Sequence, residues 1–330
     1  MEGQECNPQQ LATAESTHFV ELSQTLELIT ECSTEDQVKQ INSIFDRYLE
    51  YPSLLDPHLD VLLSQHIMLD SRDIIQEWFE SQDEESASMA RIRDDSMKRL
   101  SSLLCVAQAL CKVRGYKTVQ RFFPHEAKDV EPVLLALQKL PKENLVSWEG
   151  QYVMLLWLGM LLGNVPFDLG SIDSSSVSSE SNSIVSIILS EVKERLDDSG
   201  PTREAAAVCL ASLLARPDME QGTNRLCFND FVDWAGGICS IQSDDISKNS
   251  HSTFQLIGII HTIAVLFKKA PRSSLLKCIV KLWEPLIKLH DHGKPTLILR
   301  KLLMKLFTRL GCAYLPPRIA SWRYQRFVFL

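Results

Sequence analysis

The sequence predicts an all-α fold, and three observations support this. Along most of the 330 residues, apolar side chains recur at spacings of three and four, which is the period of a helix that buries one face. Prolines fall between these apolar stripes, as at Pro141, Pro217 and Pro271, where they end helices. No stretch alternates apolar and polar residues for long enough to form a strand. We therefore expect about a dozen helices joined by short turns.

Residues at the ends of the stripes agree with this interpretation. Ser33 or Thr34 precedes two acidic residues and is expected to be the N-cap of a helix. Thr202 is expected to do the same after the break at Gly200-Pro201. The stripes cover residues 38–48, 100–111, 185–196, 207–214, 256–267, 275–286 and 299–310.

The run 152–162 is apolar on all sides, which is typical of a helix at the centre of a layer. It is too short for a membrane span, which needs roughly 20 residues. Helices without strands favour an α-solenoid of HEAT/armadillo-like helical repeats. We expect a single helical-repeat region over residues 1–330, with a flexible Ser-rich loop at 170–183.

Residues 112–132, KVRGYKTVQRFFPHEAKDVEP, connect two apolar stripes. They combine a glycine, a pair of phenylalanines, prolines and charges of both signs, which a simple connector does not need. Gly115 stands where a glycine is expected at the end of a helix, because glycine adopts positive φ without a Cβ clash. Phe122 and Phe123 supply an apolar anchor, and Pro124 stops any helix before it. We call this segment the joint and predict that it packs specifically between helices.

Several unusual motifs in and around the joint occur in a fixed order over about residues 40–326, which is nearly the whole chain. They are LLDPHL (54–59), KVRGYKTV (112–119), RFFPHE (121–126), DVEPV (129–133), YVMLLWL (152–158), PFDL (166–169), AAAVCLASLLARPD (205–218) and WRYQR (322–326). In this order they resemble the N-terminal part of the tubulin-folding cofactor D family, also called the tubulin-specific chaperone D family.

The resemblance implies a HEAT-like chaperone scaffold in the cytoplasm, associated with the cytoskeleton and without a catalytic site or cofactor of its own. Family members capture β-tubulin after its release from the chaperonin. With cofactors C and E they assemble the αβ-tubulin heterodimer and stimulate tubulin GTP hydrolysis, and they associate with an Arf-like small GTPase. Because family members are several times longer, we expect this chain to be an N-terminal portion, a truncated isoform or an incomplete gene model.

The sequence contains only incomplete catalytic and metal-binding motifs. His125-Glu126 opens like a zinc-protease HExxH motif, but Asp129 stands where the second histidine is required. Gly293-Lys294 is followed by Pro295, so no phosphate loop is complete. No CxxC or GxSxG pattern is present, and His290-Asp291-His292 would point to different sides of a helix. We predict no enzyme activity, no cofactor and no metal.

Charge is unevenly distributed along the chain. Residues 251–330 hold 14 Lys or Arg against two carboxylates, a net of +12, so with −8 overall the first 250 residues carry −20. This distribution predicts docking of an acidic partner, and solvated charge that neutralises nearby acidic segments is the alternative. The candidate contact residues are Lys112, Arg114, Tyr116, Lys117 and Arg121 in the joint, and Arg318, Trp322, Arg323 and Arg326 near the end of the chain.

Two other classes of function remain open. A generic HEAT-type scaffold or transport adaptor would fit the same fold and charge without folding activity. An RNA-associated repeat protein would rest on the basic and aromatic residues 318–329 alone, and the net charge of −8 argues against a nucleic-acid partner. The N-terminus lacks the pattern of a signal peptide, and nine scattered cysteines favour free thiols in a reducing compartment, which predicts a cytosolic protein.

Overall fold

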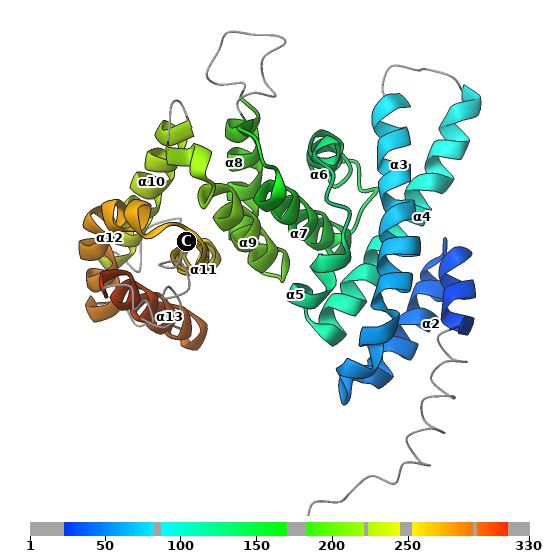
Figure 1. Cartoon of the computed structure of the whole chain (residues 1–330), viewed down its shortest axis with the longest axis horizontal. Helices are drawn as coiled ribbons and strands as arrows, with labels where there is room; N and C mark the ends of the chain where they lie inside the picture. The colour runs from blue at the N-terminus through cyan, green and yellow to red at the C-terminus, as the bar shows by residue number, and fades with distance from the viewer. Residues whose placement is uncertain are drawn as a thin grey trace, which may run out of the picture. The chain divides into compact units, whose positions relative to one another are not determined.

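A computed structural model describes residues 23–81, 87–169, 183–220, 224–244, 253–292 and 296–315. The regular structure in these residues consists of helices and includes no strand, which confirms the predicted all-α fold. The helices form two compact units, Met1–Phe167 and Asp168–Leu330, whose elements are labelled in Figure 1. None of the described helices is both long and apolar enough to cross a membrane.

The first unit is built around one long central helix. Its helices include α2 (Glu35–Asp46), α3 (Met68–Glu80), α4 (Ala87–Arg114), α5 (Tyr116–Val119), α6 (Val130–Lys139) and α7 (Trp148–Asn164), and residues 23–30 are helical as well. The central helix α4 packs against α2, α3 and α7, and α6 packs against both α3 and α7. The predicted all-apolar run lies in α7, where Trp157 is the largest fully buried side chain.

A capping box begins α2 and confirms Thr34 as its N-cap. Gln37 N donates to Thr34 Oγ1 (3.4 Å), and Thr34 N donates to Gln37 Oε1 (3.1 Å). Two backbone donors that the helix leaves without partners are satisfied in this way. Between α2 and α3 the chain forms a 3₁₀ helix, Pro52–His58, and a π-helical segment, Asp60–Ile67.

Helices of the second unit pack against the next helix but one. They are α8 (Ile184–Glu194), α9 (Thr202–Leu214), α10 (Asn224–Asp244), α11 (Thr253–Lys269), α12 (Arg272–His292) and α13 (Leu297–Tyr314). The strongest contacts join α10 to α12, α9 to α11, and α11 to α13. Such layers of alternate helices are typical of stacked helical repeats.

The structure corrects two predictions in the second unit. Thr202 is not the N-cap of α9, because Pro201 holds that position with a φ of −63° and Thr202 is the first helical residue. The stripe 275–286 is part of a longer α12, and Pro285 lies inside this helix rather than between helices. The ring of Pro285 faces α10, because its Cγ would lie 4.0 Å from a Cβ built on Gly236.

Most of the predicted Ser-rich loop, residues 170–182, lies outside the described residues. Its last serine, Ser183, caps α8 by accepting a hydrogen bond from Ser186 N (3.2 Å). The single helical-repeat region over residues 1–330 stays a prediction.

Gly258 of α11 marks a close approach within the second unit. A Cβ built there would lie 2.5 Å from Leu196 O, so the two segments would have to move apart. We predict that Gly258→Ala lowers the free energy of unfolding by about 1–3 kcal/mol in a urea titration. Gly311→Ala is the matched control, because no described atom lies within 4 Å of its Cβ position. It should preserve stability or raise it by about 0.5–1 kcal/mol, and equal losses in the two variants would contradict this packing.

Candidate functional site

The joint begins at the end of α4, where a glycine has a left-handed backbone. Gly115 has φ 91° and ψ 132°, and its N–H donates to Cys111 O (3.0 Å). The positive φ confirms the expectation for this glycine. The same conformation would cost a residue with a Cβ about 1–3 kcal/mol. The chain then forms the short helix α5 and the 3₁₀ turn Gln120–Phe122.

Backbone carbonyl groups hold the middle of the joint against two helical segments. Trp157 of α7 donates its indole N–H to Pro124 O (2.7 Å), and Ser64 of the π-helical segment donates to Phe122 O (3.2 Å). Phe123 is only 2% exposed, whereas Phe122 is half-buried. The main apolar anchor is therefore Phe123, and the two neighbouring carbonyl groups fix the path of the backbone around it.

A buried carboxylate ties the end of the joint to α3. Asp129 is 1% exposed and accepts hydrogen bonds from Arg72 Nε (2.9 Å) and Gln76 Nε2 (2.8 Å). Arg72 Nη2 also lies 2.6 Å from Glu126 Oε2. The two bonds to Asp129 Oδ1 offset part of the high cost of placing a charge away from water, while Oδ2 is buried without a hydrogen-bond partner among the described residues. No local pattern predicts the contact, because Arg72 and Asp129 are 57 residues apart in the sequence.

The same contacts shift the pKa values of the charged groups. Hydrogen bonds from Arg72 and then Lys128 lower the pKa of Glu126 to about 2. Burial opposes the charge of Arg72, but its hydrogen bonds to Glu126 and Asp129 outweigh that effect and raise the guanidinium pKa. Glu126 is therefore ionised and ion-paired at neutral pH, which makes it a poor general base.

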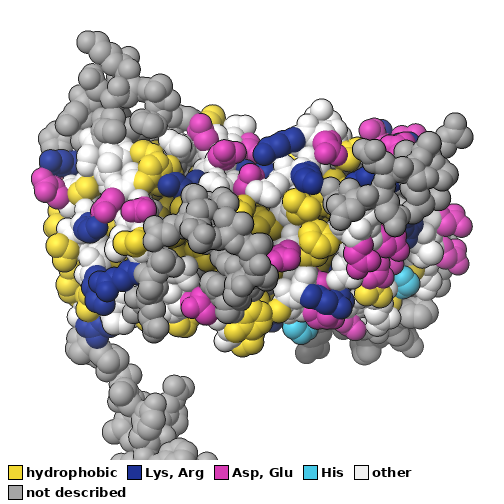
Figure 2. Space-filling view, turned by 90° about the horizontal axis from the view of Figure 1, so that it is seen from above, with side chains coloured by type: hydrophobic (Ala, Val, Ile, Leu, Met, Phe, Trp, Pro, Cys, Tyr) yellow, Lys and Arg dark blue, Asp and Glu magenta, His cyan; other side chains and the backbone are white. Residues whose placement is uncertain are grey.

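Two of the candidate contact residues form ion pairs within the first unit. Lys112 Nζ lies 2.8 Å from Asp46 Oδ1, and Arg114 binds Asp56 through two nitrogens, with 2.7 Å between Nη2 and Oδ2. The hydrogen bond from Arg114 lowers the pKa of Asp56. Such partly exposed pairs add little to the stability of the fold, because water screens their charges. Opposite charges often lie side by side elsewhere too, as the dark-blue and magenta side chains in Figure 2 show.

The remaining candidate contact residues are exposed, half-buried or outside the described residues. Tyr116 is half-buried, and Lys117 Nζ lies 5.9 Å from the centroid of its ring. Arg121 is exposed and has no ion pair with another described residue. Arg318, Trp322, Arg323 and Arg326 lie outside the described part of the chain. Contact of these residues with a partner stays a prediction.

The described residues contain no group of three or more His, Cys, Asp or Glu side chains that could hold a metal ion. Burial raises the pKa of the Cys111, Cys209 and Cys239 thiols to about 12, so these thiols stay protonated and unreactive. Within the joint, the two backbone hydrogen bonds and the buried Phe123 make a packed segment.

Helices that pack in successive layers, with no strand among the described residues, define a helical-repeat protein. Residues 45–238, more than half of the chain, match the family described as Tubulin-specific chaperone D-like, ARM repeat. The chain belongs to this family, whose members are tubulin-folding chaperones.

Two curated relatives show how far the similarity extends. The chain is similar to tubulin-specific chaperone D of Dictyostelium discoideum, with 26% identity over 86% of the chain. It is also similar to tubulin-folding cofactor D of Schizosaccharomyces pombe, with 24% identity over 92% of the chain. The chain spans about a quarter of the length of these relatives, 24% in both cases. No solved structure matches it.

The lowered pKa of Glu126 predicts a specific dependence of stability on pH. In the unfolded chain this carboxyl titrates near 4.5, and in the folded chain at about 2. Its ionised form therefore stabilises the fold above pH 4.5, and this contribution disappears as the pH falls from 4.5 to 2. We predict that Glu126→Gln is less stable than the wild type at pH 7 and that the difference vanishes near pH 2. Urea titrations at several pH values measure it.

Glu77→Gln provides the matched control for this measurement. Glu77 is an exposed carboxylate on α3 that has no ion pair with another described residue. The difference in free energy of unfolding between the wild type and this variant should stay the same between pH 2 and pH 5. A Glu126→Gln loss that is the same at every pH would contradict the contribution of the Arg72–Glu126 pair.

Proposed function

We propose that this chain is the N-terminal helical-repeat part of a tubulin-folding chaperone and that it binds β-tubulin as a non-enzymatic scaffold. In this role it takes part in assembly of the αβ-tubulin heterodimer after chaperonin release and in stimulation of tubulin GTP hydrolysis. The family match over residues 45–238 carries the proposal. Relatives named as a tubulin-specific chaperone and a tubulin-folding cofactor support it. The proposed location is the cytoplasm, in association with the cytoskeleton.

The fold and the charge distribution support a binding role. Stacked helical repeats offer long surfaces for a protein partner and need no reactive groups for that purpose. Lys117 and Arg121 of the joint are exposed, and the sequence of residues 251–330 carries a net charge of +12. Exposed cations attract an acidic partner and speed its association. From the family resemblance we further propose cofactors C and E and an Arf-like small GTPase as partners.

Capture of β-tubulin from a cell lysate tests this proposal. We predict that the immobilised chain retains β-tubulin, detected by a specific antibody. Retention should fall at least about fivefold in Lys117→Glu/Arg121→Glu, because two exposed charges then repel an acidic partner. The difference should shrink at high salt, since exposed charges are screened beyond about 10 Å at 0.1 M ionic strength.

Lys39→Glu/Lys98→Glu is the matched control, because it makes the same change in net charge at exposed positions outside the joint. It should retain β-tubulin like the wild type. Equal losses in the two double variants would contradict contact through the joint. If a full-length relative retained β-tubulin and this chain did not, tubulin binding by this part would be contradicted. Retention of other proteins without tubulin would favour a generic scaffold or transport adaptor.

A further inference from the structure

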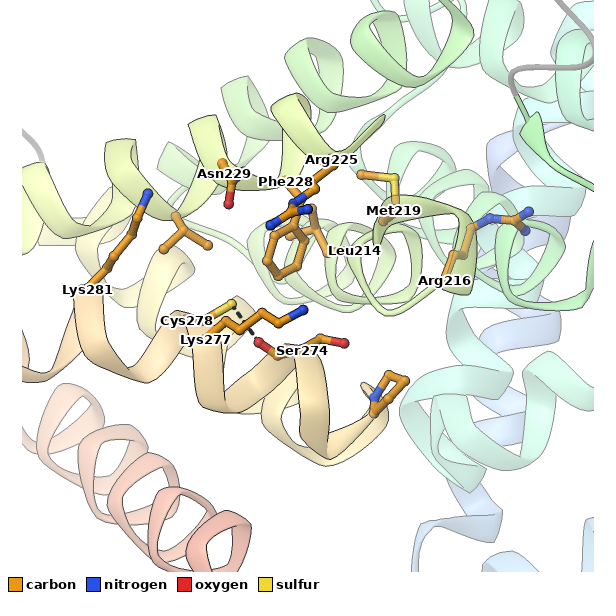
Figure 3. A pocket seen from close by; sticks show the side chains of 12 residues that line it. Leu214, Arg216, Met219, Arg225, Phe228, Asn229, Ser274, Lys277, Cys278 and Lys281 are labelled. Atoms are coloured by element: carbon orange, nitrogen blue, oxygen red, sulfur yellow. Dashed lines mark hydrogen bonds between the residues drawn. The ribbon is translucent and has the colours of Figure 1, made fainter. Parts of the chain in front are cut away.

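The second unit contains a pocket between the end of α9, the start of α10 and the first half of α12 (Figure 3). Its volume is about 360 Å³. This lies at the lower end of the range of small-ligand sites, which measure about 300–1,000 Å³. We call it the α10–α12 pocket. The proposed function makes no use of it.

The floor of the α10–α12 pocket is apolar. Leu214, Met219, Phe228 and Val232 line it and are each at most 9% exposed. Cys278 of α12 adds a buried thiol at 4% exposure. Such a surface favours a large apolar group, because its burial gains roughly 25 cal/mol for each Å² removed from water.

The polar part of the pocket is cationic. Four of its lining residues are Arg or Lys, and none is Asp or Glu. Two of the four cations are neutralised within the unit. Arg216 Nε lies 2.9 Å from Asp218 Oδ1, and Lys281 Nζ lies 2.7 Å from Asp233 Oδ1.

The other two cations, Arg225 and Lys277, are exposed, and neither has an ion pair with another described residue. Figure 3 shows both side chains near the ring of Phe228, whereas the guanidinium of Arg216 points away from them. Two positive charges without partners among the described residues therefore flank the apolar floor. This combination fits a ligand that is both acidic and apolar.

The direction of α10 and α12 adds to the positive potential. Both helices begin beside the pocket, at Asn224 and Arg272, and neither has an acidic residue in its first turn. Residues near the starts of both helices line the pocket, and Asp233 and Lys281, each nine residues past the start of its helix, form an ion pair. The two helices therefore run in the same direction. The positive ends of two helix dipoles thus lie near Arg225 and Lys277.

We propose that the α10–α12 pocket binds an acidic peptide segment of a partner protein, with one large apolar side chain on its floor and flanking carboxylates at Arg225 and Lys277. A ligand with carboxylates on both sides of its apolar group can pair with Arg225 and Lys277 together, whereas a ligand with a single carboxylate can pair with only one of them. The proposal goes beyond the proposed function, because it assigns a second site that does not depend on β-tubulin binding.

Fluorescence anisotropy with a synthetic peptide tests this proposal. The probe is a labelled peptide with a central phenylalanine and three glutamates on each side, titrated with the full chain at low salt. We expect saturable binding with a Kd below about 1 mM. Lys277→Glu and Arg225→Glu should each raise the Kd at least about fivefold, because each reverses one flanking charge. Replacing the central phenylalanine of the peptide by alanine should weaken binding by a similar factor.

Lys268→Glu is the matched control, because it reverses one exposed charge of the same unit outside the pocket. It should change the Kd less than twofold, and circular dichroism should show that all variants keep their helices. Three outcomes would overturn the proposal. They are no saturable binding at 1 mM, equal weakening by Lys268→Glu and Lys277→Glu, and tighter binding of octanoate than of the peptide. The last outcome would assign the pocket to a small carboxylate.

Discussion

One buried carboxylate fixes where the joint lies in the first unit. Asp129 is almost fully removed from water, where a charge without a partner is very costly, so its position is fixed by the groups that can pair with it. Arg72 and Gln76 supply those groups from successive turns of α3. This contact brings the end of the joint onto α3. With the joint in that place, the carbonyl group of Pro124 lies within hydrogen-bonding reach of Trp157 on α7.

Ion pairs within each unit reduce the number of Lys and Arg side chains that are free to bind a partner. Lys112 and Arg114 hold the end of α4 against neighbouring helical segments, whereas Arg121 stays exposed without an ion pair among the described residues. In the α10–α12 pocket, likewise, two of four cations are neutralised by nearby carboxylates. A count of basic residues in the sequence therefore overstates the charge that a partner can meet. The exposed cations that lack such pairs are the ones that define a binding surface.

The sequence predicted the fold class well, because helix periodicity is a local property of the chain. The same reasoning found the glycine at the end of α4 and the buried run in α7. It did not identify α10, in which Gly236 and Gly237 lower the local helix propensity and packing against α12 compensates. It also missed the roles of Arg72 and Asp129, because a contact between residues far apart in sequence leaves no periodic signal.

A double-mutant cycle on Arg72 and Asp129 tests most directly whether this ion pair holds the joint. The free energies of unfolding of the wild type, Arg72→Met, Asp129→Asn and the double variant, measured in urea, yield the coupling energy of the two side chains. The structure predicts a coupling of at least about 1.5 kcal/mol, because Arg72→Met leaves the buried Asp129 carboxylate with only the neutral Gln76 as its partner among the described residues, and Asp129→Asn removes the charge that Arg72 Nε binds. A coupling below about 0.5 kcal/mol, with losses that simply add, would contradict this and show that apolar packing alone holds the joint on α3.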